Sequence, residues 1–306
     1  MKTIINNTIA LAATLVLSVF LITFCTQTVE NPEGEDAIDK LGDALQEFKT
    51  VGLLHNKIMD EVLDDFRIHD GRFEDKEGYF VFLEESLVRN LSSKDLLQVM
   101  KVDDIRALVV EELDQTRTLY QAKMDNTLES ESIFQSLVSQ YEGLLSPKQI
   151  DILRRIEHII DNAFTVEEMI ISLEMVNNSP EVLSLSYEDR LVIYAATSVG
   201  IESAIYWSVN FGEWVEVLIY NEFSGLNYQK ISDAGFFDSV QWFRGRKMIK
   251  ADVGGGVVGA VTGCMGGLML GGVGCGPGAA TGGLIGSVGA SVGNAVSQIL
   301  NNYFPD

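Results

Sequence analysis

Two short stretches near the C-terminus match sequence patterns that carry chemistry in other proteins. Residues Gly289–Gly293 fit the G-x-S-x-G pattern of nucleophilic serines, which requires a preceding strand together with histidine and acid partners. Residues Gly274–Ala279 fit the G-x-G-x-x-A pattern of dinucleotide sites, but no strand pattern precedes them and Pro277 lies inside the loop. Both matches follow from a high glycine and serine content. The sequence therefore predicts no catalytic residue, no enzyme activity and no cofactor.

The residues that usually hold metal ions are also poorly placed. His55, His69 and His158 are far apart, and none has acidic or cysteine neighbours at the spacing of metal sites. An acidic cluster surrounds Gly71, but it does not have the spacing of a calcium loop. We interpret the cluster as a solvated turn, and we predict no metal site.

The charge of the chain limits its partners. The 306 residues carry a formal net charge of −22, whereas nucleic-acid binding needs a basic face. The same charge opposes adsorption of the main part of the protein on anionic lipid. We therefore expect no nucleic-acid partner.

The most informative segment is Val253–Pro305, which contains no Asp, Glu, Lys or Arg. Its glycines recur mainly at a spacing of four, which places them on one face of a helix, and larger apolar residues follow on the other face. The motif Gly274–Gly278, which contains Pro277, predicts a turn between two helical arms. The glycines expected on the faces are Gly255, Gly259, Gly263, Gly267 and Gly271 in the first arm, and Gly282, Gly286, Gly289 and Gly293 in the second.

Such helices need compensation, because each glycine costs about 1 kcal/mol relative to alanine in a helix interior. Close approach of two backbones provides it, and a bilayer excludes unpaired backbone groups. Each arm could span a hydrocarbon core, which takes about 20 helical residues. We interpret 251–306 as a membrane-active hairpin that binds membrane lipid and self-associates through its glycine faces. A helix pair packed beneath the rest of the protein is the main alternative, and a disordered linker is another.

Aromatic and basic residues directly precede the uncharged segment. They are the chain's only dense basic cluster, and they fit an anchor at a membrane interface. An ordinary solvated turn and a protease-sensitive junction are alternatives. The residues in question are Trp242, Arg244, Arg246, Lys247 and Lys250.

The N-terminus has the features of an export signal. Residues 1–25 combine Lys2 with a long uncharged apolar run that ends at Cys25. This arrangement resembles a bacterial lipoprotein signal, which implies lipidation of Cys25, although Phe24 stands where that motif has a small residue. A cleaved signal without lipid and an uncleaved anchor are the alternatives. All three options place the rest of the chain outside the cytoplasm, with residues 26–36 as a polar tether.

Cys264 and Cys275 remain as a pair once Cys25 is assigned. In an oxidising compartment they can form a disulfide, provided that the first arm ends early. Two unpaired, small apolar side chains are the alternative.

The residues between the two ends have helical periodicity and no run that alternates with period two. Helix starts are predicted at Ser146, Thr165 and Ser186, each followed three residues later by an acidic or amide side chain. The fold class is therefore all-α. We expect helical regions at 37–145 and 146–250, forming one or two bundles, followed by the glycine-rich hairpin.

The glycine-rich arms resemble two families. They are similar to the glycine-zipper hairpins of envelope lipoproteins, which implies attachment to a membrane of the cell envelope. They also resemble the Gly-x-x-x-Gly peptides of class II bacteriocins, which implies a secreted pore-forming precursor whose tail is released near 244–250. The preferred hypothesis is a non-enzymatic exported envelope protein. A soluble binding module whose core contains the hairpin is a third hypothesis.

Overall fold

The computed structural model describes residues 35–69, 73, 75–98, 100–124, 133–220, 237–269 and 274–303. Within these ranges all regular structure is helical and no strand occurs, which confirms the predicted all-α class. Residues 1–25, including Cys25, and residues 26–34 of the expected tether lie outside the described part. The chain divides into two units, Met1–Gly42 and Asp43–Asp306. The second unit contains residues 43–145 of the first expected helical region, the whole of the second region and the hairpin.

The described helices range in length from three residues to 34 residues. In order, they are α2 (Glu35–Ile68), α3 (Lys76–Ser92), η1 (Asp95–Leu97), α4 (Val102–Met124), α5 (Ile133–Ser139), η2 (Glu142–Leu144), α6 (Pro147–Asn162), α7 (Val166–Asn177), α8 (Pro180–Leu183), α9 (Tyr187–Tyr220), α11 (Phe237–Met269) and α12 (Cys275–Tyr303).

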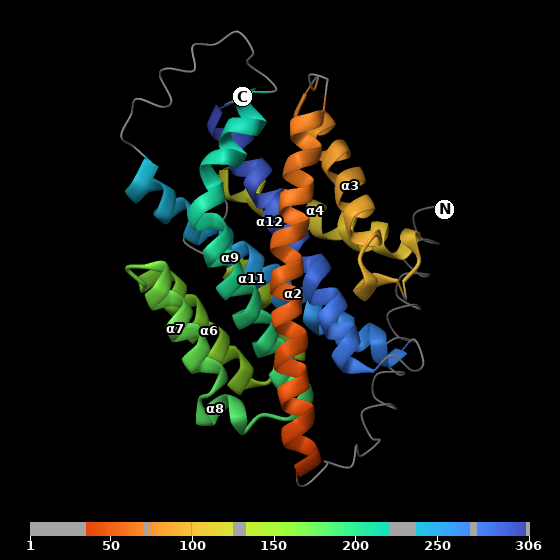
Figure 1. Cartoon of the computed structure of the whole chain (residues 1–306), viewed down its shortest axis with the longest axis vertical. Helices are drawn as coiled ribbons and strands as arrows, with labels where there is room; N and C mark the ends of the chain where they lie inside the picture. The colour runs from red at the N-terminus through yellow and green to blue at the C-terminus, as the bar shows by residue number, and fades with distance from the viewer. Residues whose placement is uncertain are drawn as a thin grey trace, which may run out of the picture. The chain divides into compact units, whose positions relative to one another are not determined.

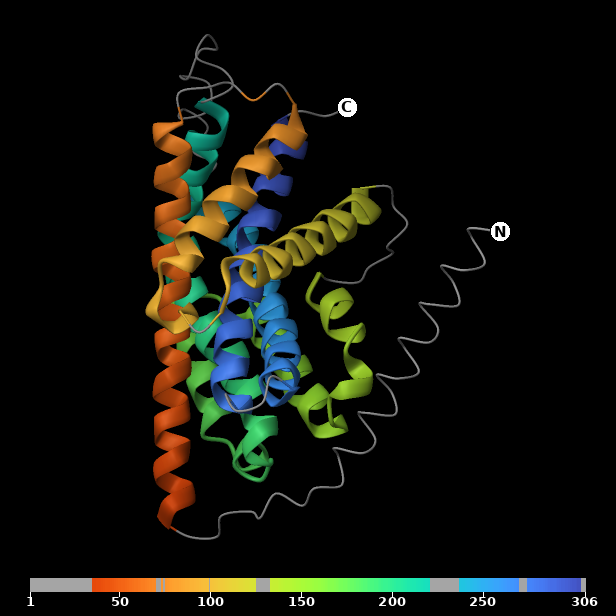
Figure 2. The same ribbon diagram turned by 90° about the vertical axis from the view of Figure 1, so that its right-hand side faces the viewer.

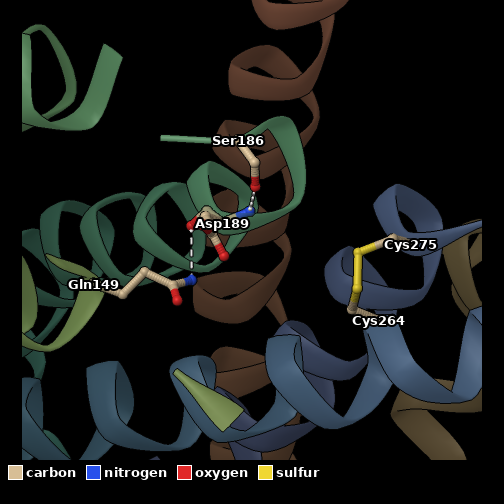
Figure 3. The surroundings of a disulfide bond; sticks show 5 residues. All are labelled: Gln149, Ser186, Asp189, Cys264 and Cys275. Atoms are coloured by element: carbon tan, nitrogen blue, oxygen red, sulfur yellow. Dashed lines mark hydrogen bonds between the residues drawn. A yellow bond between two sulfur atoms is a disulfide. The ribbon is translucent and has the colours of Figure 1, made fainter. Parts of the chain in front are cut away.

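The three predicted helix starts are confirmed. Ser146 forms a full capping box with Gln149 at the start of α6, and Thr165 accepts a hydrogen bond from the Glu168 amide, 3.1 Å away. Ser186 accepts one from the Asp189 amide at 3.1 Å. Gln149 also donates to the Asp189 carbonyl, 3.1 Å away, and this hydrogen bond is drawn as a dashed line in Figure 3. The caps thus satisfy free amides and join the beginnings of α6 and α9.

Helices α11 and α12 form the centre of the second unit. Of all the helix pairs described, these two share the most extensive contact, and α11 also packs on α9, α5 and α6 while α12 packs on α4, α9 and α3. Figures 1 and 2 show the two helices, coloured blue, running alongside each other among the helices of the body. The uncharged segment thus provides much of the core.

Helix α9 is the second buried element. Every residue from Leu191 to Gly200 is buried, and Trp207 and Trp214 are among the largest fully buried side chains. Because α9 contacts both α11 and α12, it covers the hairpin along one side. None of the described helices contains a stretch that is both long enough and apolar enough to cross a bilayer.

Candidate functional site: the glycine-paired hairpin

The glycine hairpin, defined as residues 251–269 of α11 together with α12, is held together by direct contact between backbones. A Cβ atom added to Gly259 would overlap the Gly282 carbonyl oxygen, and one added to Gly282 would overlap the Gly259 carbonyl. The pairs Gly255 with Gly286 and Gly263 with Gly278 show the same reciprocal approach. Only glycine fits at these positions, so the two predicted glycine faces meet each other within one chain.

The pairing continues to the tip of the hairpin. A Cβ on Gly267 would lie 2.5 Å from the Gly274 carbonyl oxygen, while Gly274 has a φ of +80°, which favours glycine. The turn was predicted at Gly274–Gly278, but α12 already begins at Cys275. Pro277 occupies the first turn of α12, where a missing amide is tolerated. Gly271 lies outside the described residues.

Two glycines of the predicted zipper face have a different partner. A Cβ on Gly289 would lie 2.9 Å from Cβ of Glu112, and one on Gly293 would lie 3.2 Å from Cδ2 of Leu113. Both neighbours belong to α4. The four second-arm glycines still lie within about 60° of one another around the helix axis, as predicted. Their common face meets two different neighbours, α11 at Gly282 and Gly286 and α4 at Gly289 and Gly293.

A disulfide joins the two arms near the tip. Cys264 of α11 and Cys275 of α12 are bonded, with their Cα atoms 4.1 Å apart (Figure 3). The sequence left open whether these residues pair, and suggested that a bridge would require α11 to end early. Helix α11 nevertheless continues to Met269, five residues beyond Cys264. The disulfide needs no early end of α11, because the glycine contacts already bring the two helices close together.

The basic residues before the hairpin lie within continuous helix. Lys250 forms an ion pair with Asp161 of α6 at 2.8 Å, and Arg246 donates to the Asp161 carbonyl. Met248 is buried, whereas Lys247 is exposed. The stretch 244–250 is therefore not a turn. Trp242 and Arg244 belong to α11 by backbone, and their side chains lie outside the described set.

A buried acid lies at the entrance to the hairpin. Asp252 and His55 are both 0 % exposed. The Asp252 Oδ2 atom accepts hydrogen bonds from the Ser203 hydroxyl and, at 2.9 Å, from Trp207 Nε1, and it lies 3.6 Å from His55 Nε2. These contacts connect α2 and α9 to α11, so the first arm is attached to the body through a carboxyl group.

The environment of Asp252 changes its proton affinity. Burial raises the pKa of Asp252, while His55 and the hydroxyl and indole donors lower it in part. Its Oδ1 atom has no hydrogen-bond partner among the described residues. Although serine, histidine and aspartate meet here, the Ser203 hydroxyl donates to the carboxyl and not to the histidine, so the trio does not have the geometry of a catalytic triad.

A second buried acid contacts the other arm. Glu112 of α4 is 7 % exposed and packs against Gly289. Burial, and to a smaller extent the neighbouring Glu111, raise the pKa of Glu112 to about 8. Sequence reasoning missed both buried acids, since Glu112 lies in an acidic helix and Asp252 is 197 positions away from His55. The one available signal is that Asp252 directly adjoins the uncharged segment.

A cleft of about 560 Å³ lies between α5 and α6. Phe134 and Leu153 form apolar parts of its lining, and Arg154 and His158 are among its polar residues. Among the described residues, no group of histidine, cysteine or acidic side chains could hold a metal ion.

Comparison with protein-family models, curated proteins and solved structures gives no match to this chain.

The first prediction concerns the glycine contacts. Replacing Gly259 with alanine should lower the free energy of unfolding by about 3 kcal/mol, because the new methyl group meets rigid backbone. Gly256→Ala is the matched control one turn away, since its Cβ would lie 3.4 Å from the nearest side-chain atom. The control should raise stability by about 0.5–1 kcal/mol through helix propensity. Urea denaturation followed by circular dichroism measures both, and equal effects would contradict the assigned pairing.

The second prediction concerns Asp252. Asp252→Asn keeps an oxygen that can accept from Ser203 and Trp207, so its free energy of unfolding should change by no more than about 1 kcal/mol at neutral pH. Asp252→Leu leaves both donors buried without an acceptor and should cost about 3 kcal/mol. Urea denaturation followed by tryptophan fluorescence distinguishes the two variants. If asparagine proves as damaging as leucine, the carboxyl group is required as a charge.

Proposed function

We propose that the protein is a non-enzymatic, exported cell-envelope protein that stores a membrane-active glycine hairpin inside its own helical body. In this proposal Cys25 anchors the chain, the body keeps the hairpin away from lipid, and the released hairpin inserts into or assembles at a membrane. The observation that carries the proposal is that the glycine pairs and the disulfide, which join the two arms, lie within the hairpin itself.

The contacts within the hairpin differ in kind from its contacts with the body. The glycine pairs and the Cys264–Cys275 disulfide lie entirely within the hairpin. Its attachment to the body consists of side-chain contacts, which include those of Asp252 on the first arm. Lys250, which directly precedes the first arm, adds an ion pair with Asp161. Departure of α11 and α12 as a pair would therefore break body contacts and leave the backbone pairing intact.

The outer surface of the paired hairpin suits lipid. Val257, Val261, Leu284 and Val288 are buried against the body or each other, and the segment that follows Asp252 carries no charged residue until Asp306. Helical arms satisfy their own backbone hydrogen bonds, as a bilayer requires. Asp252 and Lys250 stand at one end of the first arm, where charged side chains can reach the membrane interface.

Self-association takes a specific form in this proposal. The glycine faces are occupied by each other in the described fold, so pairing through them with a second molecule would require α11 and α12 to separate. We therefore propose that hairpins assemble through their outer, larger apolar faces.

A secreted pore-forming precursor is the second candidate. It is favoured by the observation that an acidic helical body covers the uncharged arms. Release by cleavage near 244–250 would need prior unfolding, because proteolytic nicking favours exposed loops and this stretch is helical and partly buried.

The proposed function is tested by locking the hairpin to α4. Cβ of Thr116 lies 3.4 Å from the position of a Cβ on Gly293, which is close to the 3.5–4.5 Å range of disulfides, about 3.8 Å on average. The double variant Thr116→Cys/Gly293→Cys should therefore cross-link α4 to α12 on oxidation. Formation of the bond is verified by intact mass before use.

We expect the oxidised double variant to release no dye from phosphatidylethanolamine–phosphatidylglycerol vesicles just below its unfolding temperature. After reduction the same protein should release dye, because the hairpin can leave the body. Wild-type protein with and without reductant controls for the native disulfide. Equal leakage by the locked and reduced forms would contradict storage, and no vesicle binding by any form would contradict the membrane function.

A further inference from the structure

The contact between α4 and the second arm of the hairpin contains an acid, Glu112, that forms no ion pair with any residue the structure describes. Glu112 packs its Cβ against the bare backbone of Gly289, and its Oε2 atom has no hydrogen-bond partner among the residues the structure describes. One turn later, Thr116 packs against Gly293, and its hydroxyl is also buried without a partner. Buried polar atoms are normally hydrogen-bonded, so this contact is costly for a charged carboxylate.

The charges around Glu112 do not compensate for its burial. Its own helix presents the exposed Glu111, which repels it, and Tyr141, following α5, has a pKa that is raised by burial and by both glutamates. Helix α12 has no charged residue. On the α3 side of α4, Arg106 and Arg117 are already paired with Glu84 and Glu77.

Burial and Glu111 together raise the pKa of Glu112 to about 8. In the closed structure the carboxyl is therefore protonated at neutral pH. When α4 leaves α12, water reaches the group, its pKa returns to the ordinary value of 4.5, and it loses its proton at neutral pH. The folded form binds more protons than the open form between these two values, so its stability falls as pH rises from about 4.5 to about 8.

We propose that Glu112 is a proton-dependent latch that holds α4 on the second arm of the glycine hairpin while uncharged and disfavours this contact once ionised. Acid keeps the latch closed, and neutral to alkaline conditions favour opening. For its consequence at a membrane, the latch rests on the proposed function above, because it then regulates release of the stored hairpin. The pH dependence is opposite to that of a switch that opens when a histidine is protonated, because here loss of a proton favours opening.

The test compares Glu112→Gln with Glu111→Gln in the full chain. Glutamine removes the titration at nearly constant size, and the control removes the same charge one residue away on the exposed face. The unfolding equilibrium constant is measured by urea denaturation between pH 5 and 9. Between pH 5 and 7.5, the unfolding equilibrium constant should increase with pH more steeply in wild type and Glu111→Gln than in Glu112→Gln. The difference between the two slopes should be at most about tenfold per pH unit, which corresponds to one proton.

A direct readout covers the case in which Glu112→Gln does not fold. Infrared spectra of wild type at pH 7 should contain a protonated carboxyl band that diminishes as pH rises through about 8. Glu112→Met, which is apolar and of similar length, supplies the difference spectrum. Equal pH slopes in all folded variants, or a carboxyl band that Glu112→Met leaves unchanged, would overturn the latch.

Dye-release measurements distinguish a failure of the proposed latch from a failure of the proposed membrane function. Dye release from the same vesicles should be faster at pH 8 than at pH 6 for wild type, and the difference should be lost in Glu112→Gln. A steep stability slope without dye release at any pH would support the latch and contradict the membrane function. Dye release without any effect of Glu112 on its pH dependence would contradict the latch alone.

Discussion

The described fold depends on the approach of two helix backbones that have no side chains between them. At Gly259 and Gly282 each helix packs against the carbonyl group of the other, which is the closest packing available to two helices. Glycine-rich helices are intrinsically unstable, because each glycine in a helix interior costs about 1 kcal/mol relative to alanine. Close backbone contact supplies the missing stabilisation through dispersion and exclusion of solvent. A substitution at a paired glycine therefore disturbs packing throughout the core, whereas a substitution at most surface positions does not.

The body around the hairpin combines apolar cover with two buried acids. Asp252 attaches the first arm to α9 through Ser203 and Trp207, and Glu112 lies against the second arm. Buried carboxyl groups are costly unless they are protonated or paired. A core made only of valine and glycine would have no dependence on pH, whereas these two groups couple its stability to protons.

Much of this architecture could be predicted from local patterns. Gly255, Gly259 and Gly263 define a helix face by spacing, and Ser146 and Thr165 define helix starts by capping chemistry. Spacing, however, does not specify what a face meets: lipid, a second chain and the other arm all accept glycine. Because of Pro277, the sequence predicts a turn at Gly274–Gly278. It therefore does not predict that Gly274 and Gly278 continue the series of glycine contacts. The contacts of Asp252 with His55 and Trp207 depend on tertiary packing between distant segments, which no local pattern contains.

The central claim is that the glycine hairpin is folded into the helical body of the full-length protein. Amide hydrogen exchange of the intact chain in buffer, resolved to short peptides, measures this most directly. The account predicts that peptides from 251–261 and 279–297 exchange among the slowest in the protein, because their amides lie in buried helices and open only with the core. Rapid exchange of these peptides beside a protected α9 would contradict it.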